Sequence, residues 1–291
     1  MRVLVAGGSG AIGSEVIRLL KAQGDWVRTL SRNPQKAEAL ARIVDEVKLA
    51  DATKDIGDAA EGVDVVVSAM GASVALDFKD RRSYRTTDLG ANTLLLDAVK
   101  AAGVQRIVYL GAHTVPGILN TRYVAAHEAF VEKLKNSGLG YTVVRPTGVF
   151  TALSPIVDLA RKPAMALIGD GSAKTNPVHP TCVAEEVLRR LEKGPIDAPI
   201  GGPDIITRKQ IFELAAQAVG KKARFVRMPP VMFRMGGAFT RLFHPRLGEL
   251  LEFAAAVSVH EAIAPQIGTR KLDAWFQGIA RFQSLGPGTG A

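Results

Sequence analysis

Short runs rich in Val and Ile alternate along the chain with longer stretches in which apolar residues recur at helical spacing. The runs predict strands, and the stretches between them predict helices that bury one face. The predicted strands are residues 2–6, 26–30, 47–49, 63–69, 106–110 and 141–145, and the predicted helices are residues 56–61, 89–102, 125–137 and one that begins near Ser14. Strands that alternate with helices predict a parallel sheet with right-handed crossovers, which is a doubly wound α/β fold.

The alternation of strands and helices becomes irregular after Arg145. We expect a long loop, a short strand, a helix, a strand that returns to the main sheet, and a helix that Thr207 caps. The corresponding ranges are residues 147–175, 176–179, 181–191, 196–200 and 208–219, with a loose tail at 284–291. We therefore expect a sheet domain and a smaller, mainly helical C-terminal region. The sheet domain comprises residues 1–150, with 176–201 returning to it, and the helical region comprises 151–175 and 202–291.

The first predicted strand leads directly into the glycine-rich turn Gly7-Gly8-Ser9-Gly10-Ala11-Ile12-Gly13 and then into a helix. Gly7 allows the tight turn, Gly10 lets the backbone approach a pyrophosphate, and Gly13 lets the helix pack on the strand. The start of the helix adds unpaired N–H groups and the positive end of its dipole. A strand, turn and helix in this order predict a Rossmann fold with a dinucleotide at Gly7, Ser9, Gly10, Ala11, Ile12 and Gly13.

The end of the second predicted strand bears on which dinucleotide binds. An NAD site usually has Asp or Glu there, which accepts a hydrogen bond from the ribose 2'-hydroxyl. This chain instead has Ser31 and Arg32, followed by Lys36. The planar Arg32 guanidinium suits a 2'-phosphate, with Ser31 and Lys36 assisting, so the sequence favours NADP(H) over NAD(H). The alternative is that Arg32 and Lys36 are solvated surface charges.

The remaining cofactor candidates follow from the position of the strand ends. Ligands of doubly wound folds bind outside the carboxyl ends of the strands, and these ends lie along one edge of the sheet. Besides the glycine turn, that edge collects Arg32, Asp51, Ala52, Ala69, Met70, Gly71, Pro146 and residues 111–113. We expect these residues to line one continuous site.

Composition narrows the classes of function. The 291 residues have a net charge of +9, but the charge is spread along the chain without a basic tail, so we expect no nucleic-acid partner. The single Cys182 excludes an intrachain disulfide, and the five His are too far apart in sequence to predict a metal site. No apolar run is long enough to span a bilayer. Because the first strand begins at residue 2, we expect no signal peptide and a cytoplasmic protein.

Several further motifs, together with the glycine turn, carry a family resemblance. They are Ser31 to Lys36, Gly62-Val63-Asp64, Asn92, residues 97–104, Ser137 to Pro146, Val178 to Glu185 and Gly201-Gly202-Pro203. On these motifs, which cover nearly the whole chain, it resembles the atypical short-chain dehydrogenase/reductases, specifically the NmrA-like NAD(P)H-binding group. The resemblance implies a bound nicotinamide cofactor and a loop over it at residues 147–175. Cys182 stands where relatives commonly have Asp.

In the dehydrogenase superfamily a Tyr, a Lys four residues later and a Ser reduce carbonyls, and the resemblance places Tyr123 at the Tyr position. The Lys, one helical turn away, lowers the pKa of the Tyr and holds the ribose. Here His127 replaces the Lys, and the expected Ser is absent. Thr114 is a candidate substitute for that Ser, and His113 is a candidate substrate contact. Tyr123 and His127 are our catalytic candidates; the alternative is that they serve packing only.

Residues 228–259 are both apolar and basic, with Met, Phe and Leu interleaved with Arg. Such a segment suits a lid over a lipophilic substrate, a membrane-surface contact or a partner-binding helix. It equally suits an amphipathic helix packed on its own domain. The oligomeric state is left open by the sequence.

Two functions are compatible with these residues. The first is an NADP(H)-dependent oxidoreductase that acts on a small or lipophilic carbonyl, enone or quinone, with Tyr123 as proton donor and His127 beside the ribose. The second is a non-catalytic NADP(H)-binding redox sensor, regulator or assembly factor, which the loss of the family Ser and Lys favours. We lean toward the enzyme, because Tyr123 keeps its family position.

Overall fold

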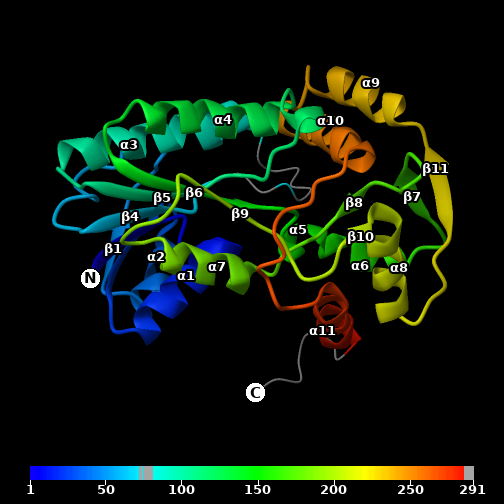
Figure 1. The fold of residues 1–291 in the computed structure, drawn as a ribbon, viewed down its shortest axis with the longest axis horizontal. Helices are drawn as coiled ribbons and strands as arrows, with labels where there is room; N and C mark the ends of the chain where they lie inside the picture. Colours follow the sequence, from blue (N-terminus) through cyan, green and yellow to red (C-terminus); the bar gives the residue numbers. More distant parts are fainter. Residues whose placement is uncertain (72–73, 75–80, 285–291) are drawn as a thin grey trace.

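A seven-stranded parallel sheet forms the centre of the N-terminal part of the protein (Figure 1). The structure is a computed structural model that describes residues 1–71, 74 and 81–284. Along the sheet the strands are β3 (Glu46–Leu49), β2 (Trp26–Ser31), β1 (Arg2–Ala6), β4 (Val65–Ser68), β5 (Arg106–Leu110), β6 (Gly140–Pro146) and β9 (Asp197–Ile200). Every neighbouring pair is parallel. The predicted doubly wound α/β fold is confirmed, because the strand order reverses direction after β1.

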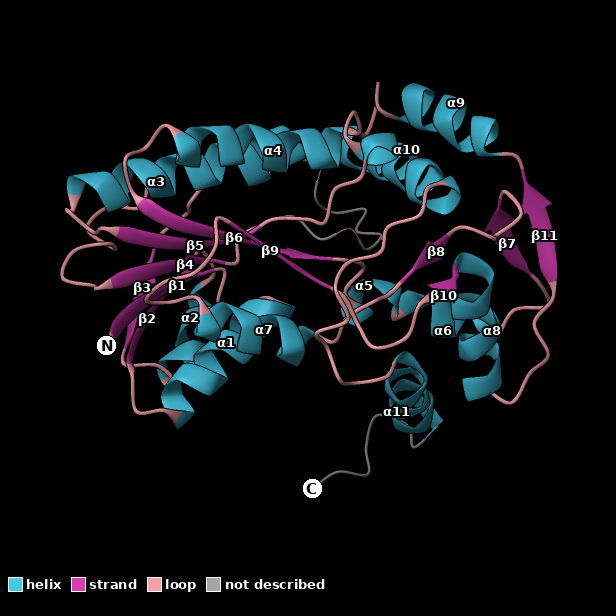
Figure 2. Ribbon diagram, viewed as in Figure 1, coloured by secondary structure: helices cyan, strands magenta, loops and turns pink. Residues whose placement is uncertain are grey.

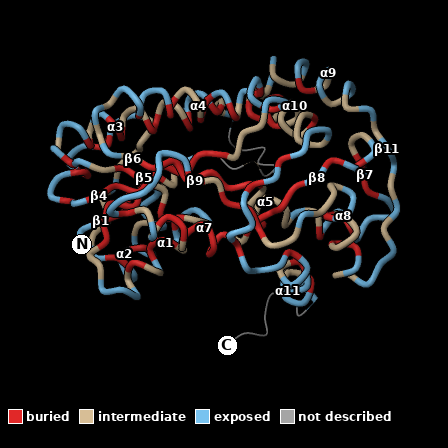
Figure 3. The backbone as a smooth tube through the Cα atoms, in the orientation of Figure 1, coloured by how far each residue is buried: buried red, intermediate tan, exposed pale blue. Residues whose placement is uncertain are grey.

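Helices cover both faces of the sheet (Figure 2). One face carries α1 (Ala11–Ala22), α2 (Pro34–Ala41) and α7 (Pro180–Arg189), and the other carries α3 (Ala91–Ala101) and α4 (Arg122–Lys135). Successive residues of β1 enter the two resulting cores in turn, since Val3 and Val5 pack on one side and Leu4 on the other. Side chains that alternate between two buried faces explain why the strands read as unbroken apolar runs. Figure 3 shows this burial along the sheet.

The C-terminal part is mainly helical, as predicted, with two small sheets. Its elements are α5 (Phe150–Leu153), α6 (Pro155–Ala160), β7 (Met165–Ile168), β8 (Lys174–Thr175), β10 (Ile206–Thr207), α8 (Arg208–Ala218), β11 (Phe225–Met228), α9 (Pro230–Thr240), α10 (Pro245–Val259) and α11 (Leu272–Ser284). A third core, which includes Phe150 and Phe276, holds it together. Thr207 caps α8 as predicted, and its capping box with Gln210 satisfies backbone N–H groups of both residues.

Four local predictions differ from the structure. Residues 56–61 form turns instead of a helix, because Gly57 and Gly62 adopt positive φ angles of 58° and 67°. Residues 147–175 contain α5, α6, β7 and β8 instead of a long loop, and their apolar side chains enter the third core. The strand predicted at 176–179 is reduced to a single bridge at Val178. Helix α11 was not predicted, and the predicted tail lies outside the described residues except for Ser284.

Candidate functional site

The glycine turn between β1 and α1 has the geometry of an anion cradle. Gly7 has a φ of +89°, and a Cβ at Gly7 or at Gly13 would overlap backbone atoms, so only glycine fits these two positions. At Gly10 a Cβ would have a single neighbour, the Gly7 carbonyl, which shows that this residue faces open space. Gly10 begins α1 without a side-chain cap, so the first N–H groups of the helix are available to a ligand. The turn therefore fits a pyrophosphate.

The residues predicted around the 2'-phosphate lie at the ends of β2 and β3. Ser31 is buried, and its hydroxyl donates a hydrogen bond to the Asn33 carbonyl. Arg32 and Lys36 are exposed, and among the described residues neither side chain has an ion pair or hydrogen-bond partner. Hydrogen bonds from Thr53, and to a lesser extent the charge of Arg32, hold the pKa of the Asp51 carboxyl below its usual range. Arg32 is thus solvated near Asp51 and can rotate onto an anion.

A cavity of about 520 Å³ opens where the glycine turn meets the C-terminal region. Nine of the predicted site residues line it: Gly10, Ala11, Ile12, Ala69, Met70, Gly71, Tyr123, His127 and Pro146. The other predicted site residues do not line it. Three of them lie elsewhere in the glycine turn, namely Gly7, Ser9 and Gly13. The rest lie at or beyond the ends of β2 and β3, and they are Ser31, Arg32, Lys36, Asp51 and Ala52. His113 lines the cavity, whereas Thr114 does not. An extended dinucleotide suits this arrangement, with its adenosine outside the cavity and its other end within it.

Tyr123 belongs to an aromatic cluster on the wall of the cavity. Its ring packs edge-on against Tyr84, with centroids 4.9 Å apart, and against Phe253 of α10 at 4.7 Å. Burial, helped by the negative charge of Asp88 and by Tyr84, raises the pKa of the Tyr123 phenol far above its usual value. Tyr123 is therefore a neutral phenol at physiological pH, able to donate a hydrogen bond but a weak proton donor.

His127 lies between two other buried polar groups. Its Nδ1 is 2.5 Å from the Tyr109 hydroxyl, and its Nε2 is 3.5 Å from an Asp88 carboxylate oxygen. Burial, with a contribution from the Arg145 charge, lowers the pKa of His127 to about 4, so the imidazole is neutral at pH 7. Because Nε2 faces a carboxylate, the proton belongs on Nε2 and Tyr109 donates to Nδ1. A neutral ring supplies no positive charge to support a Tyr123 phenolate.

Asp88 reaches the cavity from a short π-helix, η1 (Arg85–Gly90), directly before α3. Its side chain is fully buried and accepts a hydrogen bond from Thr87. Asn92, one turn later, donates to the Asp88 carbonyl and pairs with Ser68 at the end of β4. Asn92 thereby ties the π-helix to the strand end that leads into Ala69 and Met70. π-helical turns inside helices are frequent at functional sites.

Four buried side-chain polar atoms lack a hydrogen-bond partner among the described residues, and all four belong to residues that line this cavity. They are His113 Nε2, His127 Nε2, Thr175 Oγ1 and Arg208 Nε. Buried polar atoms are nearly always paired, so their concentration in one cavity indicates that water or a ligand in the cavity completes the pairing. The unpartnered Nε2 of His127 is also suited to a hydrogen bond with a cofactor ribose hydroxyl near the nicotinamide.

Sequence reasoning missed three of the cavity's polar residues, namely Asp88, Thr175 and Arg208. They come from the π-helix, from β8 and from the first turn of α8, which are far apart along the chain. The chain did offer one local signal for Arg208, since this residue directly follows the Thr207 cap and must begin a helix. No local pattern indicated that the same helix would start at the cavity.

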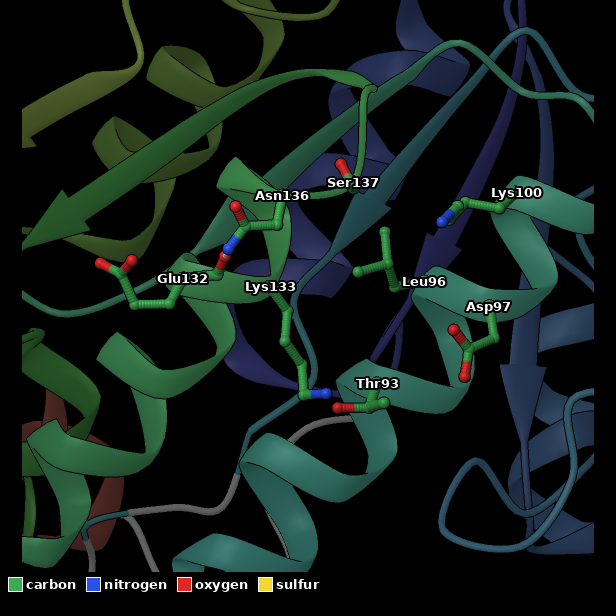
Figure 4. A pocket seen from close by; sticks show the side chains of 8 residues that line it. All are labelled: Thr93, Leu96, Asp97, Lys100, Glu132, Lys133, Asn136 and Ser137. Atoms are coloured by element: carbon green, nitrogen blue, oxygen red, sulfur yellow. Dashed lines mark hydrogen bonds between the residues drawn. The ribbon is translucent and has the colours of Figure 1, made fainter.

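A second hollow, of about 300 Å³, lies between α3 and α4 (Figure 4). Its lining consists of Thr93, Leu96, Asp97, Lys100, Glu132, Lys133, Asn136 and Ser137. Glu132 pairs with Lys135 at 2.6 Å and its carbonyl accepts a hydrogen bond from Asn136, while in Figure 4 the carboxylate points away from α3. None of the four unpartnered atoms lies here. Glu132 therefore has a structural, salt-bridging environment.

Residues 228–259 form two helices with different surroundings. Helix α10 covers the main cavity through Leu250, Phe253 and Val257. Helix α9 packs on it through Gly237, which lies against Gly248 of α10. The glycine contact places the large apolar side chains of α9 on the opposite, outer face. Among residues 1–71, 74 and 81–284, no helix has the length and apolar character needed to cross a membrane, and no cluster of His, Cys, Asp and Glu could hold a metal.

Comparison with known proteins agrees with the site geometry. Residues 7–159 match the NAD(P)H-binding family. A 3 beta-hydroxysteroid dehydrogenase/Delta 5-->4-isomerase of Mycobacterium tuberculosis is 34% identical over 122 residues, which are 39% of this chain and 32% of that protein. Photosystem II assembly factor Ycf39 of a Synechocystis strain is 26% identical over 256 residues, 84% of this chain and 75% of that protein.

A solved structure of similar fold is the UDP-glucose 4-epimerase of Thermus thermophilus in complex with NAD. Its TM-score is 0.63 and its sequence identity is 22%, and the match covers 79% of this chain and 86% of the epimerase. The match to the steroid dehydrogenase spans about a third of that protein's length. The glycine cradle, the parallel sheet and the match over residues 7–159 point to one oxidoreductase-like family. The chain therefore belongs to the NAD(P)H-binding family, within the NmrA-like group of atypical short-chain dehydrogenase/reductases.

Proposed function

We propose that this protein is an NADP(H)-dependent oxidoreductase that acts on a small or lipophilic carbonyl, enone or quinone. The observation that carries the proposal is the single cavity that runs from the glycine cradle at Gly10 to Tyr123, because it can bring a reduced nicotinamide and a substrate together. When bound, the cofactor would supply hydride. The glycine turn would hold its pyrophosphate, and the orphaned Nε2 of His127 would bind its ribose.

The preference for NADP(H) over NAD(H) rests on Arg32 and Lys36. Both are exposed cations that follow the end of β2, a position where an NAD site usually has Asp or Glu. Neither has an ion-pair partner among the described residues. A guanidinium that is not engaged within the protein can form two parallel hydrogen bonds with a 2'-phosphate. In this proposal, residues 1–150 with 176–201 bind the cofactor, while 151–175 and 202–291 shape the substrate end of the cavity.

Within the proposed substrates, the properties of Tyr123 favour quinones and enones. Its raised pKa and the neutral His127 make it a hydrogen-bond donor instead of a ready acid. Hydride addition to a quinone leaves a phenolate-type oxyanion, which is a much weaker base than the alkoxide left by a simple ketone. Tyr123 would stabilise that oxyanion by its O–H, and solvent would complete the protonation after release.

A second candidate function is a non-catalytic NADP(H)-binding regulator or assembly factor. The absence of the family Ser and Lys and the high pKa of Tyr123 favour it, as does the long match to a relative named as an assembly factor. Such a protein must bind NADPH and NADP+ with different affinities in its active conformation, since equal affinity shifts no equilibrium.

The first experiment is to follow the loss of NADPH absorbance with quinones, enones, ketones and aldehydes, with NADH alongside. Turnover with at least one class, faster with NADPH, would support the enzyme. Tight NADPH binding without turnover across all four classes would favour the regulator. A cytoplasmic location stays a prediction from the sequence.

We also propose a partner for residues 228–259. In this proposal, the outer face of α9 contacts a membrane that contains anionic lipids. Val231, Met232, Met235 and Phe239 lie within about a third of the helix circumference and are 54 to 69% exposed. The surrounding residues 214–248 contain no Asp or Glu. The basic residues of this range that are not buried are Lys221, Lys222, Arg224, Arg227, Arg234 and Arg241, whereas Arg246 is only 4% exposed. A large apolar face flanked by cations suits an anionic bilayer surface, whereas pairing with a second copy would bring like charges together.

Vesicle flotation tests this contact. Vesicles that contain phosphatidylserine should carry the protein, vesicles of phosphatidylcholine alone should not, and Phe239→Ser should abolish the binding. Phe282→Ser is the control, because Phe282 is 78% exposed on α11, away from this face. Self-association that Phe239→Ser removes, without vesicle binding, would overturn the membrane contact in favour of a dimer.

A further inference from the structure

Where α8 begins, the cavity is lined by an arginine without a counter-ion. Arg208 begins α8, and its guanidinium has no hydrogen-bond or ion-pair partner among the described residues, while its Nε is buried. Burial alone lowers the pKa of Arg208 to about 10, and no acidic group opposes this effect. A guanidinium stays charged at any physiological pH, and this one is only partly exposed, so solvent or an anion in the cavity must satisfy it.

Thr175 supplies a second unpartnered group beside this cation. Its side chain is fully buried, and its hydroxyl has no hydrogen-bond partner among the described residues. Strand β8, which carries Thr175, pairs antiparallel with β10, so that Thr175 lies opposite Ile206, and the Arg208 N–H bonds the Ala173 carbonyl at 2.9 Å. This pairing places Thr175 of β8 next to the β10 strand that leads directly into Arg208 at the start of α8, and both residues line the cavity.

His113 faces the same end of the cavity from the other side. Residue 262 forms a bridge with Thr175, and the next residue, Ile263, hydrogen-bonds His113 through its backbone. Burial lowers the pKa of His113, so its imidazole is neutral and adds a polar contact without a competing positive charge. In Figure 1, β8, β10 and α8 lie to the right of α1, the helix that follows the glycine turn.

We propose that Arg208 and Thr175 form an anion-binding subsite, and that the substrate carries a carboxylate or a phosphate bound there. The proposal rests on the proposed function for calling the ligand a substrate, but the subsite itself does not depend on turnover. The planar guanidinium can bind either group through two parallel hydrogen bonds, and the Thr175 hydroxyl adds a third. The subsite would fix the distance between the anion and the carbon that lies near Tyr123.

Calorimetric titration of the protein saturated with NADP+ tests the subsite without turnover. One pair of probes is 4-formylbenzoate and its methyl ester, and the other is glyceraldehyde 3-phosphate and glyceraldehyde. We expect the charged member of one pair to bind at least about tenfold more tightly, because hydrogen bonds to charged groups contribute about 1.5–3 kcal/mol. A preference in the first pair assigns a carboxylate, and one in the second assigns a phosphate. No preference in either pair, including no detectable binding, overturns the subsite.

Matched variants locate the effect at Arg208. Arg208→Gln should abolish the preference, Arg208→Lys should retain part of it, and Thr175→Val should reduce it about threefold to tenfold, the range for a neutral hydrogen bond. Lys209→Gln removes the same charge one residue away, where the side chain is 46% exposed and pairs with Glu213, and should change nothing. NADP+ affinity should stay within about twofold in Arg208→Gln. A larger loss would show that Arg208 binds the cofactor and would overturn the proposal.

The melting temperature of the unliganded variant gives a readout that needs no ligand. Arg208→Met replaces a partly buried charge without a partner by an apolar side chain of similar length, so the protein should become more stable. A fall in melting temperature would show that Arg208 is paired within the protein and would overturn the subsite. Absence of NADPH oxidation with 4-formylbenzoate, alongside a carboxylate preference in the titration, would count against the oxidoreductase proposal only.

Discussion

At the Gly10 end of the cavity the protein presents backbone N–H groups, whereas at the Arg208 end it presents side chains from three distant segments. The backbone at the Gly10 end is tightly packed, because there is no room for a Cβ at Gly7 or Gly13. The second end depends on the packing of β8, β10 and α8, and its polar atoms lack partners within the described protein. In the proposed function, the backbone at the first end binds the cofactor, and the side chains at the second end select the substrate.

Tyr123 stands between the two ends, and its substitution should have the largest effect on rate. Tyr123→Phe keeps the ring contacts with Tyr84 and Phe253 but removes the hydroxyl. Steady-state turnover should fall about a hundredfold or more, the contribution of a positioned proton or hydrogen-bond donor, while NADPH affinity is unchanged. Unchanged turnover would remove Tyr123 from the mechanism and leave the cavity a binding site only.

His127 should make the stability of the protein depend on pH below neutrality. Its folded pKa of about 4 lies below the ordinary value of 6.5, so between these values the unfolded chain binds a proton that the folded protein does not. Above about pH 6.5, His127 therefore contributes about 3 kcal/mol to the free energy of unfolding. This contribution is lost as the pH falls toward 4. Denaturant unfolding of the wild type and of His127→Gln at a series of pH values should show this difference. The exposed His260, replaced by Gln, is the control; equal slopes in all three proteins would contradict a neutral His127.

A methyl group at Gly13 should affect the cofactor end alone. Gly13→Ala forces a Cβ onto the Gly7 carbonyl, and overpacking strain of about 1–3 kcal/mol should weaken NADPH binding by about tenfold to a hundredfold. Gly278→Ala in α11 is the matched control, since its added Cβ would contact nothing within 4 Å. Equal NADPH affinities in the two variants would place the pyrophosphate away from the glycine turn.

The smallest of these effects concerns cofactor choice. Arg32→Ala should reduce the ratio of NADPH to NADH affinity by about tenfold, as expected for the loss of a charged hydrogen bond, with little change for NADH. Arg42→Ala is a suitable control, because Arg42 is an exposed arginine paired with Glu38. If the ratio stays at its wild-type value in Arg32→Ala, the assignment of the 2'-phosphate is wrong.

The difference between the two ends also explains what the sequence could predict. The order of strands and helices and the glycine turn follow from local rules of spacing, and the structure has most of them in the predicted places, apart from the helix expected at 56–61 and the strand expected at 176–179. Thr175 and Arg208 share a wall only because β8 pairs with β10 across 31 residues, and Asp88 reaches the cavity through an irregular π-helical turn. Tyr123 and His127 were found by family resemblance, but their protonation depends on burial, with added effects of Asp88 on Tyr123 and of Arg145 on His127, which no local pattern shows.

The central claim is that one cavity accepts the nicotinamide at one end and an anionic substrate at the other. A crystal structure of the complex with NADP+ tests it most directly. We predict the pyrophosphate on the N–H groups after Gly10, the nicotinamide beside Tyr123 with its ribose at His127, and the wall at Arg208 and Thr175 left open to solvent or to an anion. A nicotinamide outside the cavity, or a cofactor phosphate bound to Arg208, would contradict the account.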